Sequence, residues 1–210
     1  MSTVSTILTS VGYKLGGGIT VSSTSDPSQA TCIQWLNETI SWVTALCAEE
    51  NSDLGRKLGT ITTVEGTTEY DDLCDDIYAP AQQGWIVHTT YRSPIQLRSE
   101  DVLMDYDPSE RVEPTEFYLD GENQICFPSE PDDAYTVKIP YWEIPVALTA
   151  TTDIVPFFGI MDNVFIESIV IRAQDRDEYD LAYSLKWQSF LMDRVRRAIA
   201  LRKRTSVSVS

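Results

Sequence analysis

The fold class is decided by a stretch rich in β-branched and aromatic residues, Thr60-Ile-Thr-Thr-Val-Glu-Gly-Thr-Thr-Glu-Tyr70. Two strand-like runs flank Glu65-Gly66, an arrangement that predicts a β-hairpin. More runs of this kind follow, beginning at Gly84, Pro94, Glu116, Gln124 and Ala134. A tight turn is expected at Asp120 to Asn123, and one helix from Ser99 to Tyr106. We therefore expect residues 56–150 to form an antiparallel β-sandwich or barrel.

Helical spacing precedes this strand-rich region. Apolar residues from Val4 to Leu15 recur every three or four positions and stop at Gly16-Gly17-Gly18, which predicts a short amphipathic helix. A second helix is expected to open at Asp26-Pro27, with proline in its first turn. It carries two neighbouring apolar stripes, Ile33, Leu36, Ile40, Val43 and Cys47, and Trp35, Trp42 and Leu46. Because this arc exceeds the roughly 100° that one contact needs, the helix should pack on two sides.

Helical spacing returns after the strands. One helix is expected from Phe158 to Gln174 and a last one from Asp177 to Arg204, whereas the repetitive tail of residues 205–210 should be flexible. The first and last helical zones each carry a stripe that needs a partner. The sequence thus predicts an α+β fold. Residues 1–55 and 151–204 would form a discontinuous helical bundle, and residues 56–150 an inserted β domain.

Composition is typical of a globular protein from a reducing compartment. The 210 residues, 42% of them hydrophobic, should bury roughly 70% of the unfolded surface. Neither a signal peptide nor an apolar segment of membrane-spanning length is visible, which predicts a soluble protein made in the cytoplasm. Cys32 and Cys47 would lie about 22 Å apart along one helix, too far for a disulfide.

Few residues suggest catalysis or metal binding. His88 is the single histidine, which excludes a multi-histidine metal site, and no nucleophile motif accompanies it. The acidic residues from Asp71 to Asp76 lack the glycine and distal glutamate of a calcium loop. Gly16-Gly17-Gly18 lacks the Lys-Ser/Thr of a phosphate loop. We expect no enzymatic activity, no cofactor and no metal.

Charge is distributed unevenly along the chain. The net charge is −16; residues 1–150 carry 7 basic and 24 acidic side chains, and residues 151–210 carry 9 and 8. This balance predicts no affinity for free DNA. Near the end, six cations occur without an acid among them: Arg194, Arg196, Arg197, Arg202, Lys203 and Arg204. A helix dipole explains two or three of these, and a partner surface of opposite charge is the alternative.

The order of segments resembles the head-to-tail adaptor, or connector, family of short-tailed bacteriophages. The resemblance covers about residues 5–204. Its matching pieces are residues 60–70 with Leu73-Cys-Asp-Asp76, Phe117 to Pro128, residues 133–135 leading to Tyr141 to Leu148, and Asp153-Ile-Val-Pro156 before two closing helices. Cys74 stands where similar sequences tend to have proline.

The resemblance implies a structural virion protein of the neck, without catalytic residues. Such proteins form a ring, usually of twelve copies, that joins the portal to the tail nozzle and forms part of the DNA ejection channel. The expected partners are portal protein, tail proteins and further copies of this chain. Trp35, Trp42 and Leu46 are then expected at the subunit interface, and the six cations from Arg194 to Arg204, with the tail, at the portal.

Two other functions compete with this interpretation. Tryptophan and tyrosine rings could form the stacking platform of a carbohydrate- or ligand-binding β-module, from a virion or a soluble protein, although most such rings fill cores and interfaces. A metal-dependent hydrolase is disfavoured by the single histidine and the scattered cysteines. Rings would favour the adaptor, and a lasting monomer that binds glycans would favour the β-module.

Overall fold

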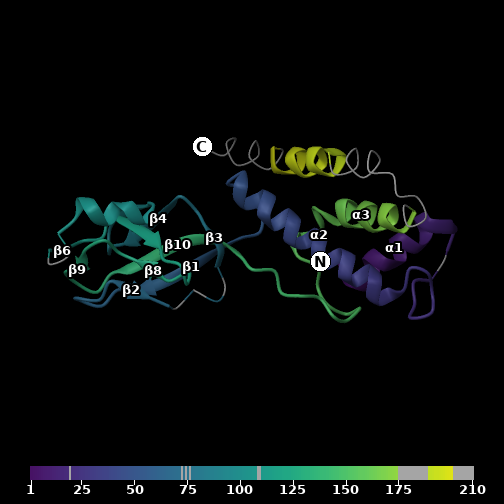
Figure 1. The fold of residues 1–210 in the computed structure, drawn as a ribbon, viewed down its shortest axis with the longest axis horizontal. Helices are drawn as coiled ribbons and strands as arrows, with labels where there is room; N and C mark the ends of the chain where they lie inside the picture. Colours follow the sequence, from purple (N-terminus) through teal and green to yellow (C-terminus); the bar gives the residue numbers. More distant parts are fainter. Residues whose placement is uncertain are drawn as a thin grey trace. The chain divides into compact units, whose positions relative to one another are not determined.

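The computed structural model describes residues 1–18, 20–71, 73, 75, 77–107, 110–174 and 189–200. The chain forms two compact units. The first, the helical unit, combines Met1–Gly55 with the chain from Pro145 onward, and the second, the β unit, is Arg56–Ile144. The β unit is thus inserted, in sequence, between two parts of the helical unit. Figure 1 labels α1, α2 and α3 of the first unit and most strands of the second.

The first helix of the helical unit, α1 (Val4–Gly16), confirms the predicted amphipathic helix. Thr3 caps it, because its hydroxyl oxygen accepts the Thr6 N–H at 3.3 Å. Gly17 ends it in the left-handed conformation, with φ 75°, and donates its N–H to the Tyr13 carbonyl. The apolar side chains of one face, Val4, Ile7, Leu8 and Val11, are buried.

The second helix, α2 (Gln29–Glu49), begins later than predicted. Ser28 is its cap, and the Ser28 hydroxyl accepts the Thr31 N–H at 3.2 Å. Pro27 therefore precedes the cap, and its predicted place in the first turn is wrong. All members of the first predicted stripe are buried, namely Ile33, Leu36, Ile40, Val43 and Cys47.

The third helix, α3 (Asp162–Gln174), packs against both α1 and α2. The predicted start at Phe158 is wrong: a 3-10 turn, η2 (Phe157–Gly159), comes first. Phe157 and Gly159 have positive φ angles, 69° and 81°, which an α-helix cannot include. Inside the unit, the hydroxyls of Thr39 on α2 and Ser168 on α3 form a buried hydrogen bond of 2.8 Å.

The closing helix is described over residues 189–200 and is drawn in yellow in Figure 1. Leu191, Val195 and Ile199 form its buried stripe at four-residue spacing. The rest of the predicted helix from Asp177 to Arg204, and the tail that follows it, lie outside the described residues.

The β unit contains a mostly closed, barrel-like sheet of eight strands. Their order is β1-β10-β4-β5-β7-β8-β2, and β3 also pairs with β10. The bounds are β1 (Arg56–Thr62), β2 (Glu69–Tyr70), β3 (Ile77–Pro80), β4 (Gln83–Val87), β5 (Arg92–Leu97), β7 (Glu116–Leu119), β8 (Ile125–Cys126) and β10 (Thr136–Glu143). A separate pair joins β6 (Arg111–Val112) and β9 (Glu130–Pro131). The core lies inside the sheet and includes Ile61, Ile86, Ile95, Phe117, Phe127 and Val137.

The predicted hairpin of residues 60–70 is wrong, although its turn is present. Gly66 has φ 75° and the Thr67 N–H donates to the Val64 carbonyl at 3.0 Å. However, β1 pairs with β10, and β2 pairs with β8. The Tyr70 hydroxyl, which accepts the Val64 N–H at 2.8 Å, holds the turn in another way. With its ring packed on Phe127, Tyr70 directs the second run away from the first.

Two further details of the β unit differ from the sequence prediction. The sheet is not wholly antiparallel, because β5 and β7 run parallel through Gln96↔Glu116 and Leu97↔Phe117. The predicted helix of residues 99–106 is a 3-10 helix, η1 (Glu100–Asp105), and the Ser99 side chain makes no capping bond. The predicted turn after β7 is confirmed: Asp120 Oδ1 accepts the N–H groups of Glu122 and Gln124.

Candidate functional site

The second predicted stripe of α2 is only partly covered by its own subunit. Trp35 and Trp42 are half-buried and lie two helical turns apart on one face. Leu46, by contrast, is only 5% exposed within its own chain. The two tryptophans are thus the members of this stripe with surface left for a neighbour, and Leu46 has little.

The basic segment near the chain end is less isolated than the sequence suggested. Arg196 Nε lies 3.0 Å from Glu50 Oε1, and a nitrogen of Arg197 lies 2.7 Å from an oxygen of Asp193. Arg194 lies 4.0 Å from Glu167 and over the ring of Phe190. The three cations that the structure describes thus lie beside carboxylates from outside the segment, which the absence of an acid between Arg194 and Arg204 did not indicate. Arg202, Lys203 and Arg204 lie outside the described residues.

These ion pairs leave the three arginines available for a second contact. All three side chains are at least two-fifths exposed. Exposed pairs of this kind contribute roughly 0–1 kcal/mol, so a partner with better-placed carboxylates could displace them. The internal ion pairs therefore contribute little to the stability of the fold and leave the guanidinium groups accessible to a partner.

His88 lies directly after β4 and bridges two chain segments. Its Nε2 atom is 3.0 Å from Ser93 Oγ and 3.1 Å from Glu113 Oε1, while its ring stacks on Tyr91 with centroids 4.1 Å apart. A catalytic triad needs the serine and the acid on opposite ring nitrogens, whereas here both face the same one. His88 thus connects β5 to the segment between β6 and β7, and this geometry does not activate Ser93.

The cysteines are buried and free where the structure describes them, at Cys32, Cys47 and Cys126. Burial raises the pKa of Cys32 to about 11, that of Cys47 to about 12 and that of Cys126 to about 11. Burial therefore favours the protonated form of these three thiols.

Among the residues that the structure describes, no three metal-ligating side chains come together. The acidic stretch of residues 71–76 is only partly described, because Asp72, Cys74 and Asp76 lie outside. In the same described part of the chain, no helix is both long and apolar enough to span a membrane.

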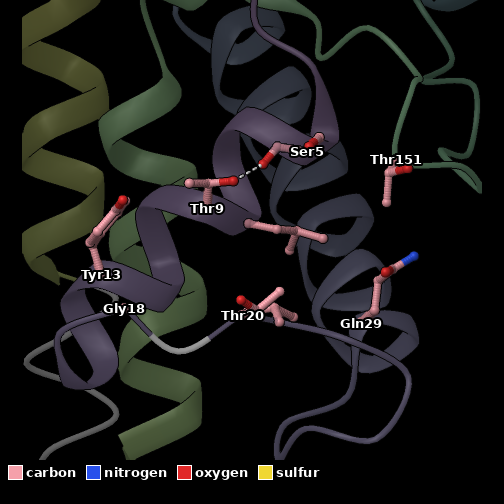
Figure 2. Close-up of a pocket in the computed structure, with 9 residues that line it drawn as sticks. Ser5, Thr9, Tyr13, Gly18, Thr20, Gln29 and Thr151 are labelled. Atoms are coloured by element: carbon pink, nitrogen blue, oxygen red, sulfur yellow. Dashed lines mark hydrogen bonds between the residues drawn. The ribbon is translucent and has the colours of Figure 1, made fainter.

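A pocket of about 250 Å³ opens along α1 in the helical unit. Figure 2 shows Ser5, Thr9 and Tyr13 on its α1 wall, with Gln29 and Thr151 on other segments. The Thr9 hydroxyl already donates to the Ser5 carbonyl at 2.8 Å. The lining residues are hydroxyl-bearing, amide or apolar and include no charged side chain. The pocket thus lacks a group that would hold a charged ligand.

A further surface, which sequence reasoning missed, lies on the β unit. Cross-strand neighbours in an antiparallel sheet point to the same side. The register Thr60↔Lys138↔Trp85↔Pro94 therefore forms one row, and Thr62↔Thr136↔Val87↔Arg92 forms the next. Ile61, Val137 and Ile86, which alternate with them, point into the core. We call these two rows, with Leu58 beside them, the outer face. No sequence pattern shows it, because its residues come from four separated strands.

The charge of the outer face differs from that of the unit around it. Residues 56–144 carry 6 basic and 19 acidic side chains, a net charge of −13. Strands β1, β4, β5 and β10 hold four of these cations and a single carboxylate, Glu143, which pairs with Lys57. The β unit thus carries one basic and apolar face on an acidic body.

Comparison with known proteins identifies the family of this chain. A search of curated proteins finds no match. The family model of the SU10 adaptor protein matches residues 2–210, which takes in both units. The match agrees with the resemblance to phage head-to-tail adaptors that the sequence suggested, and with a structural component of a virion. The chain therefore belongs to the SU10 adaptor protein family.

Proposed function

We propose that this chain is a head-to-tail adaptor, which assembles into a ring of twelve copies between the portal and the tail nozzle and forms part of the DNA ejection channel. The observation that carries the proposal is the family match over residues 2–210. Because the match includes the helical unit and the β unit together, the role belongs to the whole chain. The proposal includes a place in the virion neck and no catalytic activity.

Two surfaces of the helical unit support assembly with other proteins. The helices of the unit would form one bundle within each subunit. In the ring, the half-buried Trp35 and Trp42 would become fully buried against the next subunit. The exposed guanidinium groups of Arg194, Arg196 and Arg197, with the segment that follows, would contact the portal.

The charge of the β unit supports a place beside the DNA path. Its net charge of −13 would repel the phosphate backbone rather than bind it. A channel wall of this kind lets the genome slide without sticking.

The test is the assembly state of the purified full chain, alone and mixed with purified portal, followed by native mass spectrometry and negative-stain imaging. We expect rings, either from the chain alone or when portal is present. A protein that stays monomeric with portal and is retained on a glycan array would instead be the carbohydrate-binding β-module. If the protein forms rings but binds no portal, the adaptor function is refuted and only the oligomeric ring is supported.

A further inference from the structure

The cations of the outer face are not neutralised within their own subunit. Among the described residues, no ion pair involves Arg92 or Lys138, or Arg56 at the start of β1 beside this face. The Lys138 ammonium donates to the Thr60 hydroxyl, and the Arg92 guanidinium lies over the Trp85 ring, 5.6 Å from its centroid. The other three cations of the β unit, Lys57, Arg98 and Arg111, each pair with a carboxylate. The cations of the unit that have no ion pair among the described residues thus lie on or beside the outer face.

Apolar side chains accompany these cations. Leu58 is 52% exposed, Val87 is also exposed, and Trp85 is half-buried beside Lys138. A mixture of apolar groups with cations at their edge is typical of a protein interface rather than of a solvated surface.

A surface of matching composition lies on η1 of the same unit. Val102 anchors η1 against Tyr118 of β7 and Cys126 of β8. This leaves Leu103 42% exposed and Met104 89% exposed. The acids on either side, Glu100, Asp101 and Asp105, are exposed and have no ion pair among the described residues. The η1 surface therefore combines apolar side chains with unpaired carboxylates.

The outer face lies on β1, β4, β5 and β10, whereas η1 packs on β7 and β8. No described hydrogen bond or ion pair joins the two surfaces within one chain. A closed ring of identical subunits needs this kind of arrangement, because each subunit presents one patch to the neighbour before it and a different patch to the neighbour after it. Opposite charge at the two patches also sets the direction in which the copies join.

We propose that the outer face is a docking surface for a second copy of this chain, and that η1 of the neighbouring subunit occupies it. Leu103 and Met104 would cover Leu58, Val87 and Trp85, while the η1 carboxylates would meet Lys138 and Arg92. This contact rests on the proposed ring and adds to it an interface in the β unit, separate from the two tryptophans of α2.

The experiment is a charge swap in the full chain. One variant carries Arg92→Glu and Lys138→Glu, a second carries Glu100→Lys and Asp101→Lys, and a third combines all four changes. Analytical ultracentrifugation, under the conditions where the parent forms rings, gives the concentration of half assembly. We expect about a tenfold or larger increase in that concentration for each of the first two variants. The combined variant should recover most of the loss, which damage to the fold alone could not do.

The control matched to the second variant is Glu110→Lys with Glu122→Lys, which makes the same charge change as that variant at exposed sites of the β unit outside both surfaces. It should assemble like the parent. If the first two variants also assemble like the parent, or if the combined variant recovers nothing, the docking contact is refuted while the ring remains. If the parent forms no ring with or without portal, the proposed function itself fails.

Discussion

Asn37 and the backbone of Leu148 bind each other reciprocally within the helical unit. Asn37 Nδ2 donates to the Leu148 carbonyl oxygen at 2.9 Å, and the Leu148 N–H donates to Asn37 Oδ1 at 2.9 Å. The chain that returns from the β unit has no regular secondary structure at this point. One amide side chain on α2 thus satisfies both backbone groups of a buried residue and sets where the return segment lies.

Replacing Asn37 with leucine should destabilise the protein. The change leaves the N–H and the carbonyl of Leu148 without partners, which costs about 1–3 kcal/mol in the free energy of unfolding. Urea denaturation measures it. Gln34→Ala is the control, because it removes only an exposed bond to Glu38 on the same helix and should cost less than about 0.5 kcal/mol. If the two changes lower the free energy of unfolding equally, the two hydrogen bonds between Asn37 and Leu148 contribute no more than an exposed side-chain bond.

Replacing Trp35 or Trp42 with aspartate should block ring assembly. A charge placed in a desolvated contact costs several kcal/mol, about the size of an interface hot spot. Circular dichroism should keep its β signal, because both residues lie in the helical unit. Ser41→Asp introduces the same charge on the exposed side of α2 and should assemble normally. Rings from both tryptophan variants would place the subunit contact on another face.

The free protein should not retain duplex DNA at about 0.15 M salt, where charges are screened beyond roughly 8 Å. The reason is the net charge of −16, of which the β unit supplies −13. A gel-shift assay with the parent and with the Arg92→Glu, Lys138→Glu variant measures this. Tight binding by the parent that the variant loses would make the outer face a DNA contact.

The segment from Arg194 to Ser210 should be needed for docking to the portal. Deleting residues 205–210 should weaken docking, and changing Arg196, Arg197, Arg202 and Arg204 to glutamate should abolish it, since the partner would then meet like charge. The measurement is co-sedimentation with purified portal at several salt concentrations. Arg196 and Arg197 pair with Glu50 and Asp193, so their replacement could also affect the fold. The thermal unfolding of each variant is therefore measured beside the co-sedimentation. If both variants have the unfolding temperature of the parent and still bind portal as the parent does, the portal contact lies elsewhere.

The stability of the helical unit should fall as the pH rises above about 8.5, where the thiols of the unfolded chain begin to ionise. The folded pKa of Cys32, about 11, and of Cys47, about 12, exceed the unfolded value of about 8.5 for a thiol. Stability from the protonated thiols is complete below the unfolded pKa and is lost as pH rises toward the folded one. Urea denaturation at pH 7 and at about pH 10 should show the loss. Cys32→Ala with Cys47→Ala should reduce the difference, and an unchanged difference would assign it to other groups.

Local patterns in the sequence predicted the helices well. The helical spacing of apolar residues from Val4 to Leu15, and the glycines that end it, correspond to α1. Every residue of the first predicted stripe of α2 is buried. Helix starts were harder to predict, because a serine cap at residue 28 and positive φ angles at Phe157 and Gly159 depend on the backbone that surrounds them.

Long-range pairing was beyond local patterns. The turn at Glu65-Gly66 is present, yet β1 pairs with β10, roughly 80 residues later, because the Tyr70 hydroxyl and ring hold the second run in a different position. The outer face was missed for the same reason, since its cations are spread over four strands. The acidic partners of Arg194, Arg196 and Arg197 were missed because two of them, Glu167 and Glu50, lie far away in the sequence.

The pairing of β1 with β10 also bears on how such proteins diversify. Arg56, where the chain enters the β unit, lies opposite Trp142, close to where it leaves. Neighbouring residues on paired strands are about 5 Å apart, so the insert begins and ends at nearly the same place. Recombination could therefore exchange one sheet for another, or shorten it to a loop, without rerouting the helices. A phage lineage could in this way fit an unchanged helical frame to new neighbours.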